Sequence, residues 1–402
     1  MDNVKRNFFA FLWHSVFLAL AATFIDMNTV TSSLILEVGG REIALGLVTA
    51  IFVGVPLLVQ LIFASFLSSK NRKKPFLLLG IYMRVFSLAI IGVLLISPIS
   101  GTSLLTLIIV SISIFSFSGV FAGVSYTDLL GKSIPKDSIR KFMSYRQILK
   151  SVFAILGVFA AKMVLRIYKY PKNYSVMFFT ASLLLGIASI GFWMIKENYE
   201  AHKKLPSFWR ILKSVPSVIV KDKNLRNYIF FSNFTGFGLI IAPFYILLAR
   251  KTFTLSNDFV GIFLLFQMIG IAVASFFWGS YLRRNGYRKV LNRCVILGTT
   301  IPVLALILSY VNPYVYSVIF FLSGFTLSAR QMSFEGVLIE ISTIDNRALY
   351  IGISGALNLV TALLPLIMGI LIKYIGFFIV FPLVSLMVIT SLFFLKNISD
   401  ID

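Results

Sequence analysis

Long runs of apolar residues alternate with short polar segments along the whole chain. A helix that crosses a membrane needs about 20 predominantly apolar residues, and twelve runs are long enough. The predicted spans are Phe8–Leu36, Ile43–Leu67, Pro75–Ile96, Ser103–Leu130, Phe142–Leu165, Tyr174–Ile195, Asn227–Leu248, Phe259–Leu282, Val290–Tyr310, Tyr314–Ile341, Leu349–Tyr374 and Phe377–Leu395. The pattern therefore predicts an all-α integral membrane protein with twelve transmembrane helices.

One polar segment is much longer than the others and separates the sixth span from the seventh. We therefore divide the chain into an N-terminal six-helix bundle (1–196), a basic linker (197–226) and a C-terminal six-helix bundle (227–402). Within the linker, apolar residues recur among cations over Ser207–Val220, which is typical of a helix that lies on an anionic membrane surface. A simple tether between the two halves also accounts for this composition.

The composition agrees with a membrane protein. Of the 402 residues 58% are hydrophobic and only 13% are charged, whereas soluble domains have about 25% charged residues. The net charge of +22 would otherwise indicate a nucleic-acid partner. However, loops on one side of the predicted membrane carry about three times as many Lys and Arg residues as loops on the other. The charge is a topology signal, and it predicts a multi-pass protein of the plasma (inner) membrane with both termini cytoplasmic and no nucleic-acid partner.

Two features recur in the second half of the chain. The basic loops at residues 64–74 and 279–289 align without gaps, each with a small residue, a serine, an aromatic residue, a leucine and then consecutive cations. The second feature is an acid followed twelve positions later by an arginine, and its copies are 207 residues apart: Asp128 with Arg140, and Glu335 with Arg347. Two halves with the same features at the same places indicate an internal duplication, and so two bundles related by a pseudo-two-fold axis.

The chain has six spans, a basic linker and six more spans, with a basic loop after spans two and eight. This organisation resembles the major facilitator superfamily of secondary transporters. The loop pattern of that family is Gly-x-Leu-x-Asp-x-x-Gly-Arg-Arg. In the first loop Ala64 stands at the first Gly of the pattern, Ser68 at the Asp, Asn71 at the second Gly, and Arg72 and Lys73 at the basic pair. In the second loop Gly279 and Gly286 match the two glycines, Arg283 stands at the Asp, and Arg288 and Lys289 follow. Neither loop has the acid, which in the family helps to latch the two halves in the outward-facing state.

Charged residues at the predicted cytoplasmic ends of the spans are gating candidates. They are Arg72, Lys73, Asp128, Arg140, Arg288, Lys289, Glu335 and Arg347. The resemblance implies that such residues form a charge network that breaks and re-forms as the two halves rock. Two other interpretations stay open: the loop cations serve only the inside-positive rule, or the acid–arginine pairs are static and stiffen a helical hairpin.

Polar and ionisable residues inside the predicted spans are candidates for the substrate or coupling site. They are Asp26, Arg330, Asn233, Asn358, Arg146, Lys150 and Arg84. Charged side chains are costly in lipid and usually face an interior cavity. Arg146 and Lys150 are four residues apart on one predicted helix, so they share a face. The two asparagines have an alternative use as hydrogen-bonding contacts between helices.

The resemblance implies positions for the charged candidates in the fold. Spans one, four, seven and ten line the central path of the superfamily, which places Asp26 and Arg330 at the cavity, whereas span three, with Arg84, is usually peripheral. Asp26 is also the natural candidate for proton coupling, because burial raises the pKa of a carboxyl group. A permanent Asp26–Arg330 pair, or two separate caps on polar pockets, are the alternatives.

The sequence offers little for catalysis or cofactor binding. Two histidines and a single cysteine, Cys294, leave almost no ligands for zinc or iron. Gly131-Lys132-Ser133 resembles the end of a phosphate-binding loop, but Tyr126 stands where that loop requires its first glycine. We therefore predict no cofactor, no metal site and no enzymatic activity.

The expected function is transmembrane transport of a small solute by alternating access, driven by a proton or solute gradient, as symport, antiport or uniport. Several cations but only one acid, Asp26, lie near the middle of the predicted spans. This imbalance favours an anionic or zwitterionic substrate. The expected partners are the small-molecule substrate, the lipid bilayer and, for a proton-coupled mechanism, protons; we expect a monomer. The alternative is a lipid-handling or ligand-sensing membrane protein of the same fold, which the 40 phenylalanines leave open.

Overall fold

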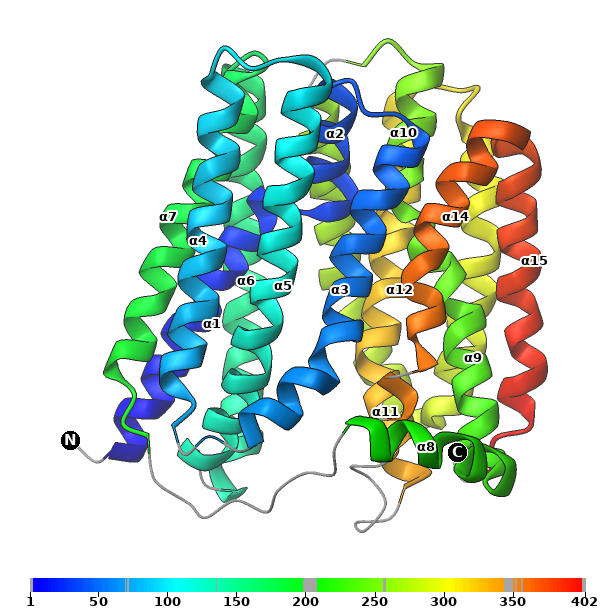
Figure 1. Cartoon of the computed structure of the whole chain (residues 1–402). Coiled ribbons are helices and arrows are strands. Elements are labelled where there is room, and N and C mark those ends of the chain that lie inside the picture. The colour runs from blue at the N-terminus through cyan, green and yellow to red at the C-terminus, as the bar shows by residue number, and fades with distance from the viewer. Residues whose placement is uncertain are drawn as a thin grey trace. The chain divides into compact units, whose positions relative to one another are not determined.

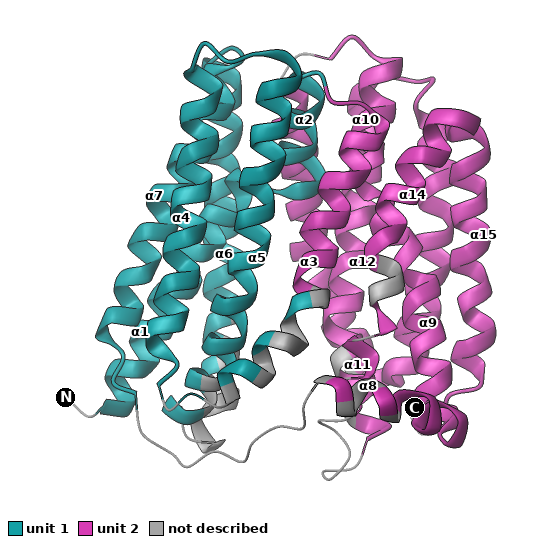
Figure 2. Ribbon diagram, in the orientation of Figure 1, with its two compact units in different colours: residues 1–39, 58–206 teal, residues 40–57, 207–402 magenta. Residues whose placement is uncertain are grey.

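The structure is a computed structural model of the 402-residue chain (Figure 1). It describes residues 3–68, 70, 72–134, 136–197, 208–255, 258–342, 350, 353–355 and 357–399. Every regular element in these residues is a helix. The helices pack into two compact units (Figure 2).

The first unit consists of residues 1–39 and 58–206. Its elements are α1 (Asn3–Phe24), the π-helix η1 (Met27–Thr31), α2 (Ser32–Glu37), the second part of α3 (Glu42–Ser68), α4 (Lys74–Ile96), α5 (Gly101–Ser133), α6 (Lys136–Ile167) and α7 (Lys172–Met194). Glycines allow close helix approach: a Cβ on Gly80 of α4 would lie 2.7 Å from the carbonyl oxygen of Ser118 on α5. Elsewhere rings fill the core, and Phe11 of α1 packs edge-on against Phe142 of α6.

The second unit consists of residues 40–57 and 207–402. Its elements are the first part of α3, α8 (Phe208–Lys221), α9 (Lys223–Ile240), α10 (Ala242–Thr252), α11 (Asp258–Leu308), α12 (Pro313–Glu340), α14 (Leu359–Ile375) and α15 (Phe377–Lys396). Within α11 the backbone leaves the helical conformation at Gly286, where φ is 75°. This positive φ favours glycine, and it divides α11 into two membrane-length helices.

The helices coincide with the predicted spans at most boundaries. Among the described residues, nine helices are long and apolar enough to cross a membrane, and Glu42–Pro56 and Ala362–Ile375 are shorter apolar helices. Two predicted spans are interrupted. The first breaks at Asp26, before η1, and the seventh breaks between α9 and α10, where Pro243 occupies the first turn of α10. The amphipathic segment of the linker is helical, as α8. The arrangement of twelve spans in two six-helix bundles stays a prediction.

Helix α3 is divided between the two units. Its first part, up to residue 57, belongs to the second unit, although the sequence placed the whole helix in a domain of residues 1–196. A Cβ on Gly46 would lie 2.5 Å from the carbonyl oxygen of Pro365 on α14, so the two backbones are in direct contact. At the start of α3, Glu42 forms an ion pair with Lys251 of α10. Pro56 stands next to the division, and proline removes a helical hydrogen bond.

Candidate solute-binding pockets

Three of the predicted cations meet in one cavity of the first unit. Arg84 comes from α4, and Arg146 and Lys150 come from α6. The cavity has a volume of about 240 Å³, and α1 and α5 complete its wall. The four-residue spacing of Arg146 and Lys150 places both on the same side of α6, as the sequence predicted. Span three therefore contributes to this cavity, although the family resemblance implied a peripheral position.

Arg84 is half-buried and lies beside an aromatic residue and a glycine. Its guanidinium carbon is 4.2 Å from the ring centre of Phe115, a cation–π contact. A Cβ on Gly119 of α5 would lie 3.7 Å from Nε of Arg84, an ordinary van der Waals contact, so α5 packs beside the guanidinium group. Nε is buried and has no hydrogen-bond acceptor in the described part of the chain. Arg84 is thus a half-buried cation whose buried Nε has an unused donor.

The α6 side of the cavity is partly held by a tyrosine. One terminal nitrogen of Arg146 donates a hydrogen bond to the hydroxyl oxygen of Tyr126, at 3.3 Å. His14 of α1 also lines the cavity, and its ring centre is 5.8 Å from that of Tyr126. No Asp or Glu occurs among the described residues that line the cavity. Its fixed charge is therefore positive.

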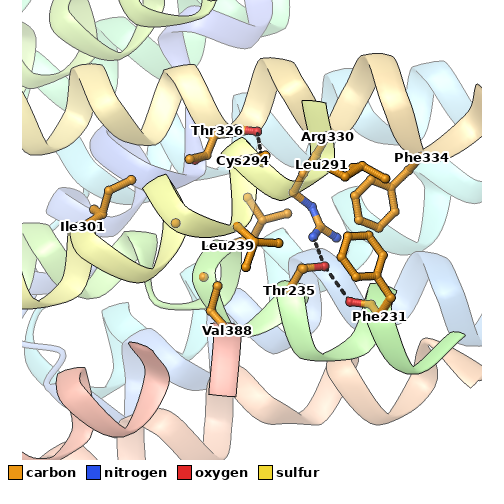
Figure 3. Close-up of a pocket in the computed structure, with 13 residues that line it drawn as sticks. Phe231, Thr235, Leu239, Leu291, Cys294, Ile301, Thr326, Arg330, Phe334 and Val388 are labelled. Atoms are coloured by element: carbon orange, nitrogen blue, oxygen red, sulfur yellow. Dashed lines mark hydrogen bonds between the residues drawn. The ribbon is translucent and has the colours of Figure 1, made fainter. Parts of the chain in front are cut away.

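The second unit has a much smaller pocket around the other predicted arginine (Figure 3). Arg330 of α12 donates a hydrogen bond to the hydroxyl oxygen of Thr235 on α9, and its guanidinium carbon is 4.0 Å from the ring centre of Phe334. Cys294 donates from Sγ to the carbonyl oxygen of Thr326, at 3.7 Å. The remaining wall is mostly apolar, and the open volume is about 20 Å³. Arg330 is thus held by protein groups in a nearly filled space.

The other span candidates lie outside both linings. Asp26 caps the π-helix η1, because its Oδ1 accepts hydrogen bonds from the backbone N–H and the hydroxyl of Thr29 at 2.9 and 2.8 Å. Asn233 donates to the carbonyl oxygen of Ile229, one turn earlier in α9. Asn358 is the residue directly before α14, at its N-cap position. Asp26 therefore has a definite structural task at the break in the first span.

Two of the gating candidates bind helix ends within their own unit. Lys73 is buried, and it donates from Nζ to the carbonyl oxygen of Lys70 at 2.7 Å. Arg288 donates to three carbonyl oxygens and so satisfies the C-terminal end of α15. These acceptors are Leu395, Lys396 and Ile398, at 3.2, 3.4 and 2.7 Å.

The remaining gating candidates divide into exposed cations and residues that the structure does not describe. Arg72 and Lys289 are exposed. The side chains of Asp128, Arg140, Glu335 and Arg347 lie outside the described residues. The gating network therefore stays a prediction.

Two acids that the sequence reasoning passed over have clear positions. Glu197, at the start of the linker, accepts hydrogen bonds from the backbone N–H groups of Lys73 and Lys74, at 2.6 and 3.2 Å. It thereby caps α4, where a carboxylate interacts favourably with the helix dipole. Glu42 pairs with Lys251. Neither pairing has a local sequence signal, because the partners are more than a hundred residues apart.

One part of the sequence matches a known family. Residues 227–400, in the C-terminal part of the chain, match the family model of the Major Facilitator Superfamily. This part of the chain is thus similar to the Major Facilitator Superfamily. The membrane-length helices indicate a multi-pass membrane protein, and the solved structures that this chain resembles are transporters rather than enzymes.

Solved transporter structures share this fold over nearly the whole chain. The nucleoside transporter NupG has 13% sequence identity and a TM-score of 0.69, with 99% of this chain and 100% of that chain covered. A POT family transporter in complex with 5-aminolevulinic acid has 11% identity and a TM-score of 0.68, with 99% and 96% covered. No curated protein sequence matches. At such low identity the likeness concerns the fold and leaves the substrate to be inferred from the pockets.

Proposed function

We propose that this protein is a secondary transporter of the Major Facilitator Superfamily that moves a small solute by alternating access, driven by a proton or solute gradient. The observation that supports this most is the cavity of the first unit, where Arg84, Arg146 and Lys150 converge. Charged side chains at membrane depth are retained where they serve a substrate or ion path. A cationic lining favours a polar solute over the lipid-handling alternative.

The proposal includes the topology predicted from the sequence. Twelve spans form two six-helix bundles in the plasma (inner) membrane, with both termini cytoplasmic, and the protein works as a monomer. The uneven distribution of Lys and Arg supports this orientation. In alternating access one bundle rocks against the other around the solute.

Helix α3 is the element that we expect to move between two packings. Its first part packs against α14 through Gly46 and is tied to α10 by the Glu42–Lys251 ion pair. Since α3 continues from the second unit into the first, we propose that rocking either bends it near Pro56 or detaches its first part, which breaks the ion pair. A pair with one half-exposed partner suits such a cycle, because exposed ion pairs contribute only about 0–1 kcal/mol. Pro56 marks the point where α3 can bend.

Asp26 is proposed as the proton-coupling residue. Its carboxylate accepts two hydrogen bonds from Thr29 at the break in the first span. Protonation weakens acceptance by the carboxylate, and so loosens the cap that holds η1 to the end of α1. Binding of a proton would thereby change the shape of a helix that the superfamily places along the central path.

A distance measurement between the two units tests alternating access without knowledge of the substrate. In a Cys294→Ser background, spin labels replace Ile99 in the first unit and Tyr310 in the second, both of which are exposed. In liposomes we expect two distance populations, and Glu42→Gln should shift their ratio towards the longer distance. Lys172→Gln, which removes an exposed charge elsewhere, should leave the ratio unchanged. A single population in native protein and in Glu42→Gln would argue against the mechanism.

A further inference from the structure

We propose that the cavity of the first unit binds the oxyanion group, a carboxylate or phosphate, of a small anionic solute. The inference deepens the proposed transport function and rests on it, since it names the class of solute. Arg84, Arg146 and Lys150 are the residues that hold the anion.

The first argument is the charge of the cavity. Three cations line it, and none of its described lining residues is acidic. Removing a charge from water without a partner is costly, and proteins offset the cost by pairing it. An anionic solute supplies the missing charge at the moment when it binds. The same cations would oppose the binding of a cation of similar size.

The second argument is the donor geometry of Arg84. Its guanidinium group is fixed over Phe115, and its buried Nε has no acceptor among the described residues. A guanidinium group presents its N–H donors in a planar fork that matches a carboxylate or phosphate. Arg146 donates to the oxygen of Tyr126, which leaves the hydroxyl proton of that tyrosine to donate elsewhere. The site therefore offers several donors for one oxyanion.

The third argument comes from the matching pocket of the second unit. On α4, the pocket of the first unit is lined by Leu77, Ile81 and Arg84. On α11, the pocket of the second unit is lined by Leu291, Val295 and Gly298, which have the same spacing along the chain. On the next helix, Gly119 and Gly123 of α5 precede Thr326 and Arg330 of α12 by 207 residues, the interval of the sequence repeat. The duplication thus produced one pocket in each unit, with the arginine on opposite helices.

The two pockets differ in what satisfies the arginine. Arg330 binds Thr235 in a space of about 20 Å³, so the protein itself fills that pocket. The pocket around Arg84 has about 240 Å³, with two further cations on its wall. This volume far exceeds the roughly 30 Å³ that a water molecule takes in the liquid. The pocket therefore has room for a small organic acid or an inorganic phosphate.

The test is a binding measurement on the full-length protein purified in detergent. The probes are succinate and inorganic phosphate, with succinamide as the neutral analogue of succinate, and phosphatidylglycerol added to the micelles as a lipid phosphate. A probe that binds the folded state raises the apparent Tm. We expect succinate or phosphate to do so, and succinamide to have no effect. In Arg84→Gln and Arg146→Gln the apparent Kd should rise about tenfold or more, whereas in Arg166→Gln, an exposed arginine of α6, it should not change.

Arg84→Met gives a second readout that needs no ligand. Replacing an uncompensated buried charge by an apolar side chain is often neutral or stabilising. Without a probe, this variant should therefore have a Tm equal to or above that of the native protein, and it should not respond to succinate or phosphate. A large fall in its Tm would show that Arg84 serves the fold and would overturn the proposal.

Three further outcomes would also overturn the proposal: no response to either oxyanion, an equal response to succinamide, or a response to phosphatidylglycerol alone. The spin-label distances separate this failure from failure of the transport mechanism. Two distance populations without anion binding would leave a transporter for another class of solute. Anion binding with one population would leave the site without the rocking mechanism.

Discussion

Arg84 and Arg330 are half-buried arginines whose guanidinium groups have different surroundings. Arg330 donates to Thr235 and lies against Phe334, in a pocket with almost no open volume. Arg84 lies against Phe115 beside a much larger cavity, with Nε unpaired among the described residues. A satisfied arginine is part of the fold, whereas an arginine with spare donors beside open space is suited to a ligand.

The structural role of Arg330 can be tested through its partner. Thr235→Val preserves the shape of the side chain but removes the hydroxyl oxygen, and so leaves a buried guanidinium group without that acceptor. We expect the free energy of unfolding to fall by about 1–3 kcal/mol, measured by thermal or denaturant unfolding in detergent. Thr300→Val, at an exposed position of α11, is the matched control and should change stability little. Equal stability of the two variants would contradict this role.

Sequence reasoning found the cations of the site but not their grouping. The cost of charge in lipid singled out Arg84, Arg146 and Lys150, and these residues lie on α4 and α6 beside one cavity. The meeting of α4 with α6 at one cavity depends on tertiary packing, which has no local pattern. For the same reason the carboxylate of Glu197 at the start of α4 could not be predicted, since its partners are 124 and 123 residues away.

At the scale of elements, hydropathy predicted the helices well because lipid imposes their length. The predicted span Phe377–Leu395 is α15, Phe377–Lys396, and the predicted span Pro75–Ile96 is α4, Lys74–Ile96. Hydropathy averages over a window, so it missed the short break at Asp26 and the division of α3 between the two units. These two features concern single turns of helix, and they are the places where the proposed mechanism requires movement.

The junction inside α11 gives a test at this scale. Gly286 has φ 75° and ψ 174°, a region of backbone conformation that is essentially restricted to glycine. Gly286→Ala should therefore reduce the free energy of unfolding by about 1–3 kcal/mol. Gly186→Ala is the control, because Gly186 is helical and a Cβ there meets nothing within 4 Å. We expect that variant to be neutral or more stable, by up to about 1 kcal/mol. A stable Gly286→Ala protein would show that the junction does not need this conformation.

At the scale of the whole molecule, we propose that the internal duplication indicated by the sequence accounts for the likeness of the two units. Each has a pocket at the same place in the repeat, and each pocket has an arginine. In the second unit the pocket is closed by its own side chains, whereas in the first it has room for a solute. We infer that one half of the transporter supplies most of the charge that recognises the solute.

Uptake into proteoliposomes tests the combination of transport with anion recognition most directly. The protein is reconstituted into lipid vesicles, and the radiolabelled oxyanion that binds in detergent, succinate or phosphate, is added outside with and without an imposed proton gradient. We predict uptake above that of protein-free vesicles, a strong reduction in Arg84→Gln, and native uptake in Arg166→Gln. Binding of the anion without any uptake, or undiminished uptake by Arg84→Gln, would contradict an anion transporter whose recognition site is the cavity of the first unit.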